Sequence, residues 1–167
     1  YGLAAEEQEF VHPGTECRPV LTYPISKAAA TTSCLGLARH LGLKLQVLRI
    51  FQVYGEGEAA TRFWPSLRAA ALSGEDFAMS AGVQVRDFIA VEEVIRQFLA
   101  ALNFEGVEAG KPQIKNVGTG CPMSLLEFAE SWWRTWNATG KLKPGKIDSR
   151  PGEASRLVAD VKNIFIS

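Results

Sequence analysis

The 167-residue chain has few cysteines, no excess of either charge and no long hydrophobic run. Its three cysteines are widely spaced without a C-x-x-C pair, so we predict neither a disulfide framework nor a bound metal. Eighteen basic side chains balance eighteen acidic ones, which argues against a nucleic-acid partner. No apolar run approaches the roughly 20 residues that cross a bilayer, and the N-terminus does not resemble a signal peptide. We therefore expect a cytoplasmic protein without a membrane span.

Segments with helical and strand character alternate along the chain. The apolar spacing predicts helices at 25–41, 61–72, 92–104 and 123–135, and strands at 43–53, 77–80, 85–91 and 111–117. Ser124 and Glu127 have the spacing of a capping box at the last helix. The turn-rich stretches 1–22 and 140–152 are predicted to be loops. This alternation predicts an α/β fold.

The segment Tyr23-Pro-Ile-Ser-Lys27 points most directly to chemistry. Residues four apart at the start of a helix lie on the same face, so Tyr23 and Lys27 are expected to be neighbours. A lysine ammonium beside a phenol favours the phenolate and lowers the phenol pKa from about 10, which makes Tyr23 a candidate general acid or base. Taken alone, the pattern is common, and a surface pair on a helix is the plainer interpretation.

Six segments occur in a recognisable order over essentially the whole chain. They are Tyr1-Gly2, Tyr23-Pro-Ile-Ser-Lys27, Leu48-Arg-Ile-Phe-Gln-Val-Tyr-Gly55, Gly82-Val-Gln-Val-Arg-Asp-Phe-Ile-Ala-Val91, Asn116-Val-Gly-Thr-Gly120 and Arg150-Pro-Gly-Glu153 followed by Asp160. Together they resemble the extended short-chain dehydrogenase/reductases that act on nucleotide sugars, the NAD-dependent epimerase/dehydratase family. The resemblance implies a Rossmann-like parallel sheet and a smaller substrate-binding lobe.

The resemblance also implies a role for each matching residue. Tyr23 would be the acid/base residue on a sugar hydroxyl, while NAD or NADP takes or gives the hydride and Lys27 holds the nicotinamide ribose. Ile50 and Phe51 would lie against the nicotinamide end of the cofactor. The residues implied to bind the nucleotide-sugar substrate are Gln52, Arg86, Arg150 and Glu153. The two arginines would grip its diphosphate, because a planar fork of donors matches phosphate oxygens.

Several of these residues also have plainer interpretations. Arg86 could form a simple ion pair with Asp87, and Arg150 could belong to a turn. Gln52 stands where the family usually has Asn, and Glu153 replaces the frequent Asp, so their contacts differ from the family pattern. The three tryptophans at 132, 133 and 136 are expected to serve packing. The family usually dimerises through the alanine-rich helix at 25–41, so a homodimer or other self-association is expected.

A G-x-x-G-x-x-G cofactor loop occurs nowhere in the chain, and Gly118-Thr-Gly120 lacks the third glycine of a dinucleotide fingerprint. We therefore expect the chain to be a C-terminal half without the cofactor-binding half. In this division 1–55 ends the Rossmann-like domain, and 56–167 is mainly the substrate lobe. The chain would then be a truncated piece of a nucleotide-sugar epimerase, dehydratase or reductase, inactive by itself. The alternatives are a binding module for a nucleotide sugar or a protein partner, and a catalytically dead remnant.

Overall fold

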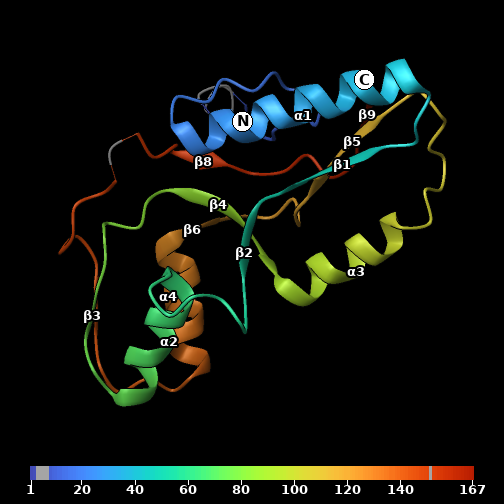
Figure 1. Ribbon diagram of the computed structural model, residues 1–167. Coiled ribbons are helices and arrows are strands. Elements are labelled where there is room, and N and C mark those ends of the chain that lie inside the picture. The colour runs from blue at the N-terminus through green and yellow to red at the C-terminus, as the bar shows by residue number, and fades with distance from the viewer. Residues whose placement is uncertain (3–7, 151) are drawn as a thin grey trace.

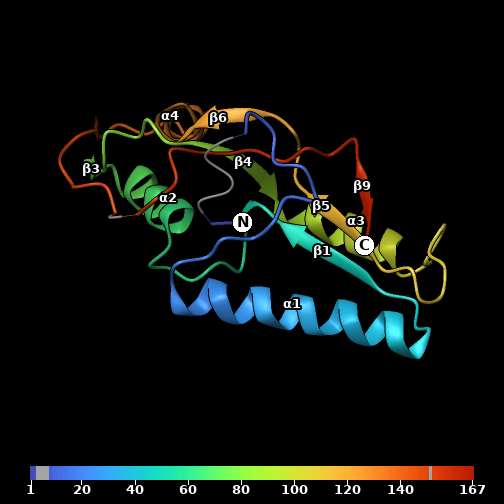
Figure 2. The same cartoon turned by 90° about the horizontal axis from the view of Figure 1, so that it is seen from above.

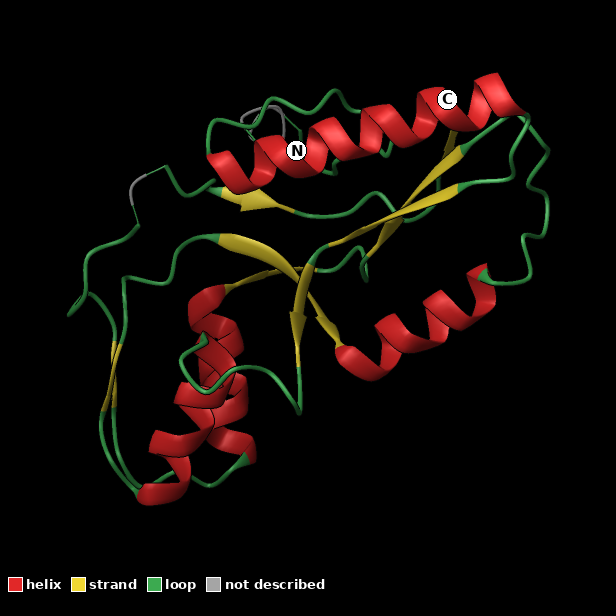
Figure 3. Ribbon diagram, viewed as in Figure 1, coloured by secondary structure: helices red, strands yellow, loops and turns green. Residues whose placement is uncertain are grey.

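The computed structural model describes residues 1–2, 8–150 and 152–167, and these residues form a mixed α/β fold (Figure 1, Figure 3). The helices are α1 (Thr22–Leu41), α2 (Phe63–Ser73), α3 (Val91–Ala101) and α4 (Leu125–Thr135). The strands are β1 (Gln46–Ile50), β2 (Gln52–Tyr54), β3 (Phe77–Ala78), β4 (Val85–Ala90), β5 (Gln113–Val117), β6 (Pro122–Ser124), β7 (Leu142–Lys143), β8 (Arg156–Leu157) and β9 (Ile164–Ile166). The predicted α/β alternation is confirmed.

One sheet is built from β1, β5 and β9, with α1 and α3 on opposite sides of it in Figure 1. β5 runs parallel to β1, and β9 runs antiparallel to β5 on its other side. Ile50 lies opposite Val117, so β1 and β5 finish at the same edge of the sheet. Among the described strands, none pairs with the outer edge of β1. Helix α1 buries only Leu35 and Ala38, so it contacts the body along a narrow stripe.

The second sheet lies on one side of the helix pair α2 and α4 (Figure 1). β2 is parallel to β4, β6 is antiparallel to β4, and the short β8 also pairs with β4. Below it, α2 and α4 pack through a buried cluster of Leu67, Ala71, Met79, Ala129 and Trp133. A short parallel ladder of β3 and β7 closes the far side. This packing fixes the segments that carry the candidate site.

The predicted strand at 43–53 is wrong as a single element. It divides at Phe51, whose N–H donates to Val117 O at 3.0 Å, and the chain then leaves the first sheet to form β2 in the second. A continuous extended pattern carries no information about which neighbour each half will pair with. The strands β8 and β9 also lie in a C-terminal region for which no strand was predicted.

The helix ends follow the local sequence. Pro24 lies in the first turn of α1, where its missing N–H costs nothing, and Gly42 ends the helix in the left-handed conformation at φ +64°. The predicted capping box of α4 is confirmed, because Ser124 Oγ accepts from Glu127 N at 3.1 Å and Glu127 Oε2 accepts from Ser124 N at 2.8 Å. None of the helices in the described part of the chain is both long and apolar enough to cross a bilayer.

Candidate functional site

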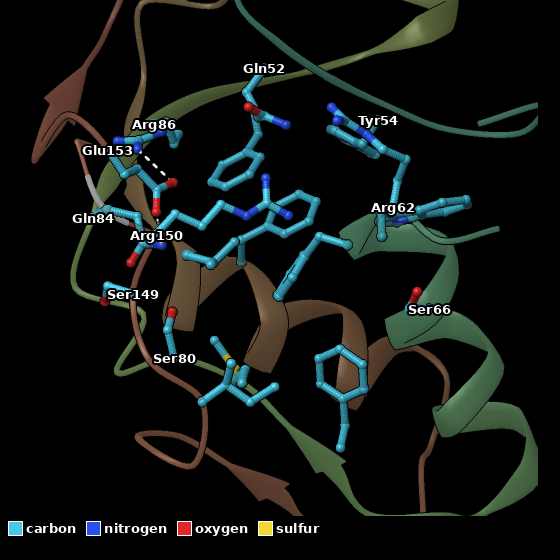
Figure 4. A pocket seen from close by; sticks show the side chains of 18 of the residues that line it. Gln52, Tyr54, Arg62, Ser66, Ser80, Gln84, Arg86, Ser149, Arg150 and Glu153 are labelled. Carbon is cyan, nitrogen blue, oxygen red and sulfur yellow. Dashed lines mark hydrogen bonds and ion pairs between the residues drawn. The ribbon is translucent and has the colours of Figure 1, made fainter. Parts of the chain in front are cut away.

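A cavity of about 320 Å³ lies between β2, β4, α2 and α4 and the residues 147–150 and 153 (Figure 4). It brings together all four residues predicted to bind substrate, namely Gln52, Arg86, Arg150 and Glu153. These residues are up to 101 positions apart in the sequence, from 52 to 153, and meet because β2 and the C-terminal strand β8 both pair with β4. The cavity is therefore a candidate ligand pocket.

Arg86 is held rigidly in the wall of this pocket. Its side chain is 9% exposed, and Nη2 donates to Glu153 Oε1 at 2.9 Å and to Ala154 O at 2.8 Å. Nη1 donates to Val85 O at 2.8 Å. The plainer interpretation, an ion pair between Arg86 and Asp87, is wrong, because Glu153 is the acidic partner. Glu153 therefore positions the guanidinium before any ligand arrives.

Asp87 is fully buried, and its carboxylate accepts hydrogen bonds, mainly from backbone N–H groups, instead of pairing with Arg86. Its Oδ1 accepts from Thr119 N and Oγ1, both at 2.7 Å, and its Oδ2 accepts from Gly120 N at 2.9 Å and Ala159 N at 3.1 Å. The N–H groups of Thr119 and Gly120 therefore already have an acceptor within the chain. A Cβ at Gly118 would lie 2.6 Å from Asp87 Oδ2, which explains the glycine before them.

Arg150 is exposed, and its side chain makes no hydrogen bond or ion pair within the described part of the chain. Its side chain extends from the Arg86 side toward the middle of the pocket (Figure 4). Arg150 also begins a turn, as its plainer interpretation predicted, because Glu153 N donates to Arg150 O at 3.2 Å. Pro151 of this motif lies outside the described residues. Arg150 is thus the one pocket arginine for which the described residues supply no acidic partner.

A second polar group, which the sequence analysis missed, lies across the pocket from Arg86 and Glu153. Tyr54 and Arg62 occupy this side (Figure 4), and Arg62 Nε lies 3.3 Å from Glu58 Oε1. The other Glu58 oxygen is buried without a hydrogen-bond partner in the described residues. Burial, followed by the charge of Glu92, raises the pKa of Tyr54, so its hydroxyl stays protonated. In the sequence, the indication of this ion pair was the spacing of four residues between the oppositely charged Glu58 and Arg62.

Aromatic side chains form the apolar wall of the pocket. Phe88 and Phe128 stack with centroids 3.9 Å apart and planes 12° apart. Behind them Trp132 stacks on Trp136 at 5.0 Å, and Trp133 is 9% exposed. The prediction that the three tryptophans serve packing is confirmed. Because these aromatic side chains are closely packed, they form a rigid wall beside the polar side chains of the pocket.

Tyr23 and Lys27 lie outside this pocket, near the beginning of α1. Lys27 Nζ is 5.4 Å from the centre of the Tyr23 ring, which is 71% exposed. Helix α1 and strand β1 run in opposite directions, so Tyr23 and the half-exposed Ile50 lie at the same end of the helix–strand unit (Figure 1, Figure 2). Phe51 follows Ile50 and packs near Tyr1, with ring centres 6.1 Å apart. The beginning of α1, which carries this pair, therefore lies at the same end of the unit as the carboxyl end of β1, and the Tyr23 ring is open to solvent.

Tyr1 belongs to a buried polar cluster beside Phe51. Its hydroxyl donates to Asn116 Oδ1, and the Arg49 guanidinium lies 4.6 Å from its ring centre. Burial raises the pKa of Tyr1, although Arg49 acts in the opposite direction. Asn116 Nδ2 in turn donates to Val11 O at 2.7 Å. These contacts fix the loop that leads to α1.

Among the described residues, no group of three or more His, Cys, Asp or Glu side chains could hold a metal ion.

Comparison with known proteins gives consistent matches over this architecture. A model of the NAD dependent epimerase/dehydratase family matches residues 1–118. The chain is 27% identical over 172 residues to the putative UDP-arabinose 4-epimerase 4 of Arabidopsis thaliana, covering 88% of this chain and 38% of that protein. It is 31% identical over 106 residues to the CDP-abequose synthase of Salmonella muenchen, covering 64% of this chain and 36% of that protein.

A solved structure, MoeE5 in complex with UDP-glucuronic acid and NAD, matches with a TM-score of 0.77 and 28% identity. The match covers 93% of this chain and 51% of that structure. The chain thus spans less than half of the two curated relatives and about half of the solved one.

Proposed function

The chain belongs to the NAD-dependent epimerase/dehydratase family, and on that premise we propose that its pocket binds a nucleotide sugar through the diphosphate. The observation that carries this proposal is the meeting of Arg86 and Arg150 in one cavity. Arg86 is fixed by Glu153, and the Arg150 side chain extends toward the middle of the pocket without an acidic partner in the described residues. A guanidinium can bind phosphate oxygens through two parallel hydrogen bonds, and Arg150 has its N–H groups available for this among the described residues. Arg86 Nη2 already donates to Glu153 and Ala154, so Arg86 would add a single hydrogen bond from its remaining N–H groups. Gln52 offers an amide at the rim.

We further propose that Tyr23 is the proton-transfer residue of an epimerase, dehydratase or reductase. Bound NAD would supply the hydride acceptor and donor for the sugar. The residues that suit its nicotinamide end are accessible: Ile50 is 46% exposed at the end of β1, and Lys27 projects from α1 beside Tyr23. Ligands of open α/β sheets bind at the carboxyl ends of the strands, which is where these residues lie. Lys27 would hold the ribose hydroxyls, and the Tyr23 hydroxyl would exchange a proton with a sugar hydroxyl.

The chain spans about half of its solved relative, so the full reaction is proposed for an assembly in which another segment contributes the cofactor loop. Self-association through α1 is proposed on the same basis, because most of that helix is exposed. A second candidate is a binding module without turnover. It is favoured by the location of the pocket, because Tyr23 and Lys27 do not line it.

Isothermal titration of the 167-residue chain with UDP and with UDP-glucose tests the binding proposal. We expect both to bind, and Arg150→Ala to weaken both by about tenfold, the usual loss of one charge-assisted contact. Arg134→Ala is the matched control, because Arg134 is exposed in the last turn of α4 and does not line the pocket. If neither nucleotide binds, or if Arg150→Ala binds as the wild type does, the proposal is wrong.

A further inference from the structure

The segment that carries Arg150 is anchored to the body of the fold at its two ends. At one end Ile147 N donates to Met79 O at 3.3 Å, and at the other Val85 N donates to Ser155 O at 2.9 Å. Arg150 lies between these anchors, and its exposed side chain has no partner in the described part of the chain. The position of its guanidinium therefore depends on how the segment itself is held.

The carboxylate of Glu153 holds this segment against the wall of the pocket. Its Oε1 accepts from Arg86 Nη2 at 2.9 Å, and its Oε2 accepts from Gln84 Nε2 at 3.4 Å. Both donor side chains are buried and line the pocket. The backbone of Glu153 closes a turn at the same time, because its N–H donates to Arg150 O at 3.2 Å. Glu153 thus joins the buried wall to the arginine that extends into the cavity.

From these contacts we infer that Glu153 is a positioning residue for Arg150, and not a ligand contact as the family resemblance implies. The inference rests on the proposed function, in which Arg150 binds the anionic part of the ligand. Both carboxylate oxygens of Glu153 already have donors within the chain. Holding Glu153 on two buried side chains fixes the residue whose N–H closes the turn, so Arg150 has less conformational freedom to lose when the ligand binds.

The charges around the pocket agree with this role. Its lining carries three guanidinium and three carboxylate groups, which belong to Arg62, Arg86 and Arg150 and to Glu58, Asp148 and Glu153. The charge of Glu153 is largely cancelled by Arg86 at 2.9 Å, so an anion meets a pair with little net charge. Asp148 has no ion pair within the described residues and lies two positions from Arg150. An arginine released from the turn could pair with Asp148 instead of the ligand, which makes the hold on Arg150 important.

Arg86 depends less on Glu153 than Arg150 does. Without the carboxylate, Arg86 Nη2 keeps Ala154 O as an acceptor and Nη1 keeps Val85 O, both at 2.8 Å. The side chain of Arg150 has no such second hold among the described residues. Loss of the carboxylate should therefore reach the ligand mainly through Arg150. The effect on affinity should then stay below the contribution of Arg150 itself, about tenfold.

A double-mutant cycle on UDP binding to the 167-residue chain, measured by titration calorimetry, tests the inference. Glu153→Ala should weaken binding by about fivefold on its own, and by less than about twofold when Arg150→Ala is already present. Glu153→Gln, whose amide oxygen can still accept from Arg86, should weaken binding by about threefold on its own and add nothing to Arg150→Ala. Glu130→Ala is the matched control, because Glu130 is exposed on α4 and does not line the pocket.

Unchanged affinity in Glu153→Ala, or an equal loss with and without Arg150→Ala, would overturn the inference while the proposed function stands. Tighter binding of UDP by either variant would also overturn it, since Glu153 would then act mainly by repelling the ligand. If UDP fails to bind the wild type, the proposed function fails and the inference with it. Removing the acidic partner of a buried arginine can unfold a protein. If Glu153→Ala does not fold, the Glu153→Gln cycle decides, and the same two outcomes refute the inference there.

Discussion

Replacing Asp87 by asparagine is predicted to destabilise the whole fold, although the two side chains have nearly the same shape. The carboxylate accepts four hydrogen bonds, and an asparagine oxygen at the Oδ1 position can keep the two from Thr119. The new NH₂ group would then face the N–H donors of Gly120 and Ala159, which lose their acceptor. Ala159 is fully buried, so water cannot reach its N–H, whereas Gly120 is partly accessible.

The expected loss follows from these two donors. An unsatisfied buried donor costs roughly 1–3 kcal/mol, and partial hydration of Gly120 reduces its share, so Asp87→Asn should cost about 2–4 kcal/mol. Domain stabilities are about 5–15 kcal/mol, so the change is easily measured. Urea unfolding followed by tryptophan fluorescence gives the free energy of unfolding. Glu130→Gln, an exposed charge change on α4, is the control. An Asp87→Asn value within about 1 kcal/mol of the wild type would refute this account.

Two further predictions concern the contribution of Asp160 to stability at low pH and the role of Tyr23 in proton transfer. Hydrogen bonds from Asn163 and from the backbone N–H of Lys162 hold the pKa of Asp160 below its usual value, so its stabilisation is present above the unfolded-state pKa and is lost as the pH falls through the folded one. In the wild type, the urea unfolding midpoint should therefore decrease as the pH falls below about 4, and in Asp160→Asn this decrease should be smaller. The same decrease in both proteins would contradict the prediction. In a longer form that also carries a cofactor-binding half, Tyr23→Phe should lower kcat by about 10²–10⁴-fold with an unchanged circular dichroism spectrum, and retained turnover would exclude the proposed role.

The sequence predicted the family and the alternating architecture well, because both depend on local patterns. The capping box of α4 needs only Ser124 and Glu127, three residues apart, and it formed as expected. The strand at 43–53 failed, because its extended pattern is satisfied equally by one long strand and by two strands in different sheets. The division at residue 55 stays a prediction, since β5 and β9 return to the sheet of β1 from far along the chain.

The candidate site was predicted in part. The family-like segments named the four residues that gather in the pocket, but they did not reveal that Glu153 would hold Arg86. That contact joins residues 67 positions apart and has no local signature. Glu58 and Arg62 were overlooked because a pair of opposite charges four residues apart is common on exposed chain. Only the fold shows that this pair borders a cavity.

The dispersal of the pocket along the chain has a consequence for the order of folding. Its wall begins at β2, and Arg86 acquires its acidic partner only when the segment of Glu153 and Ala159 docks on β4 and Asp87. Closing loops of this length is slow, because the entropy of the intervening chain is lost before the contact forms. The pocket should thus be among the last parts of the molecule to become native. A chain shortened by its final fifteen residues could still form α2 and α4, yet would lack a completed anion site.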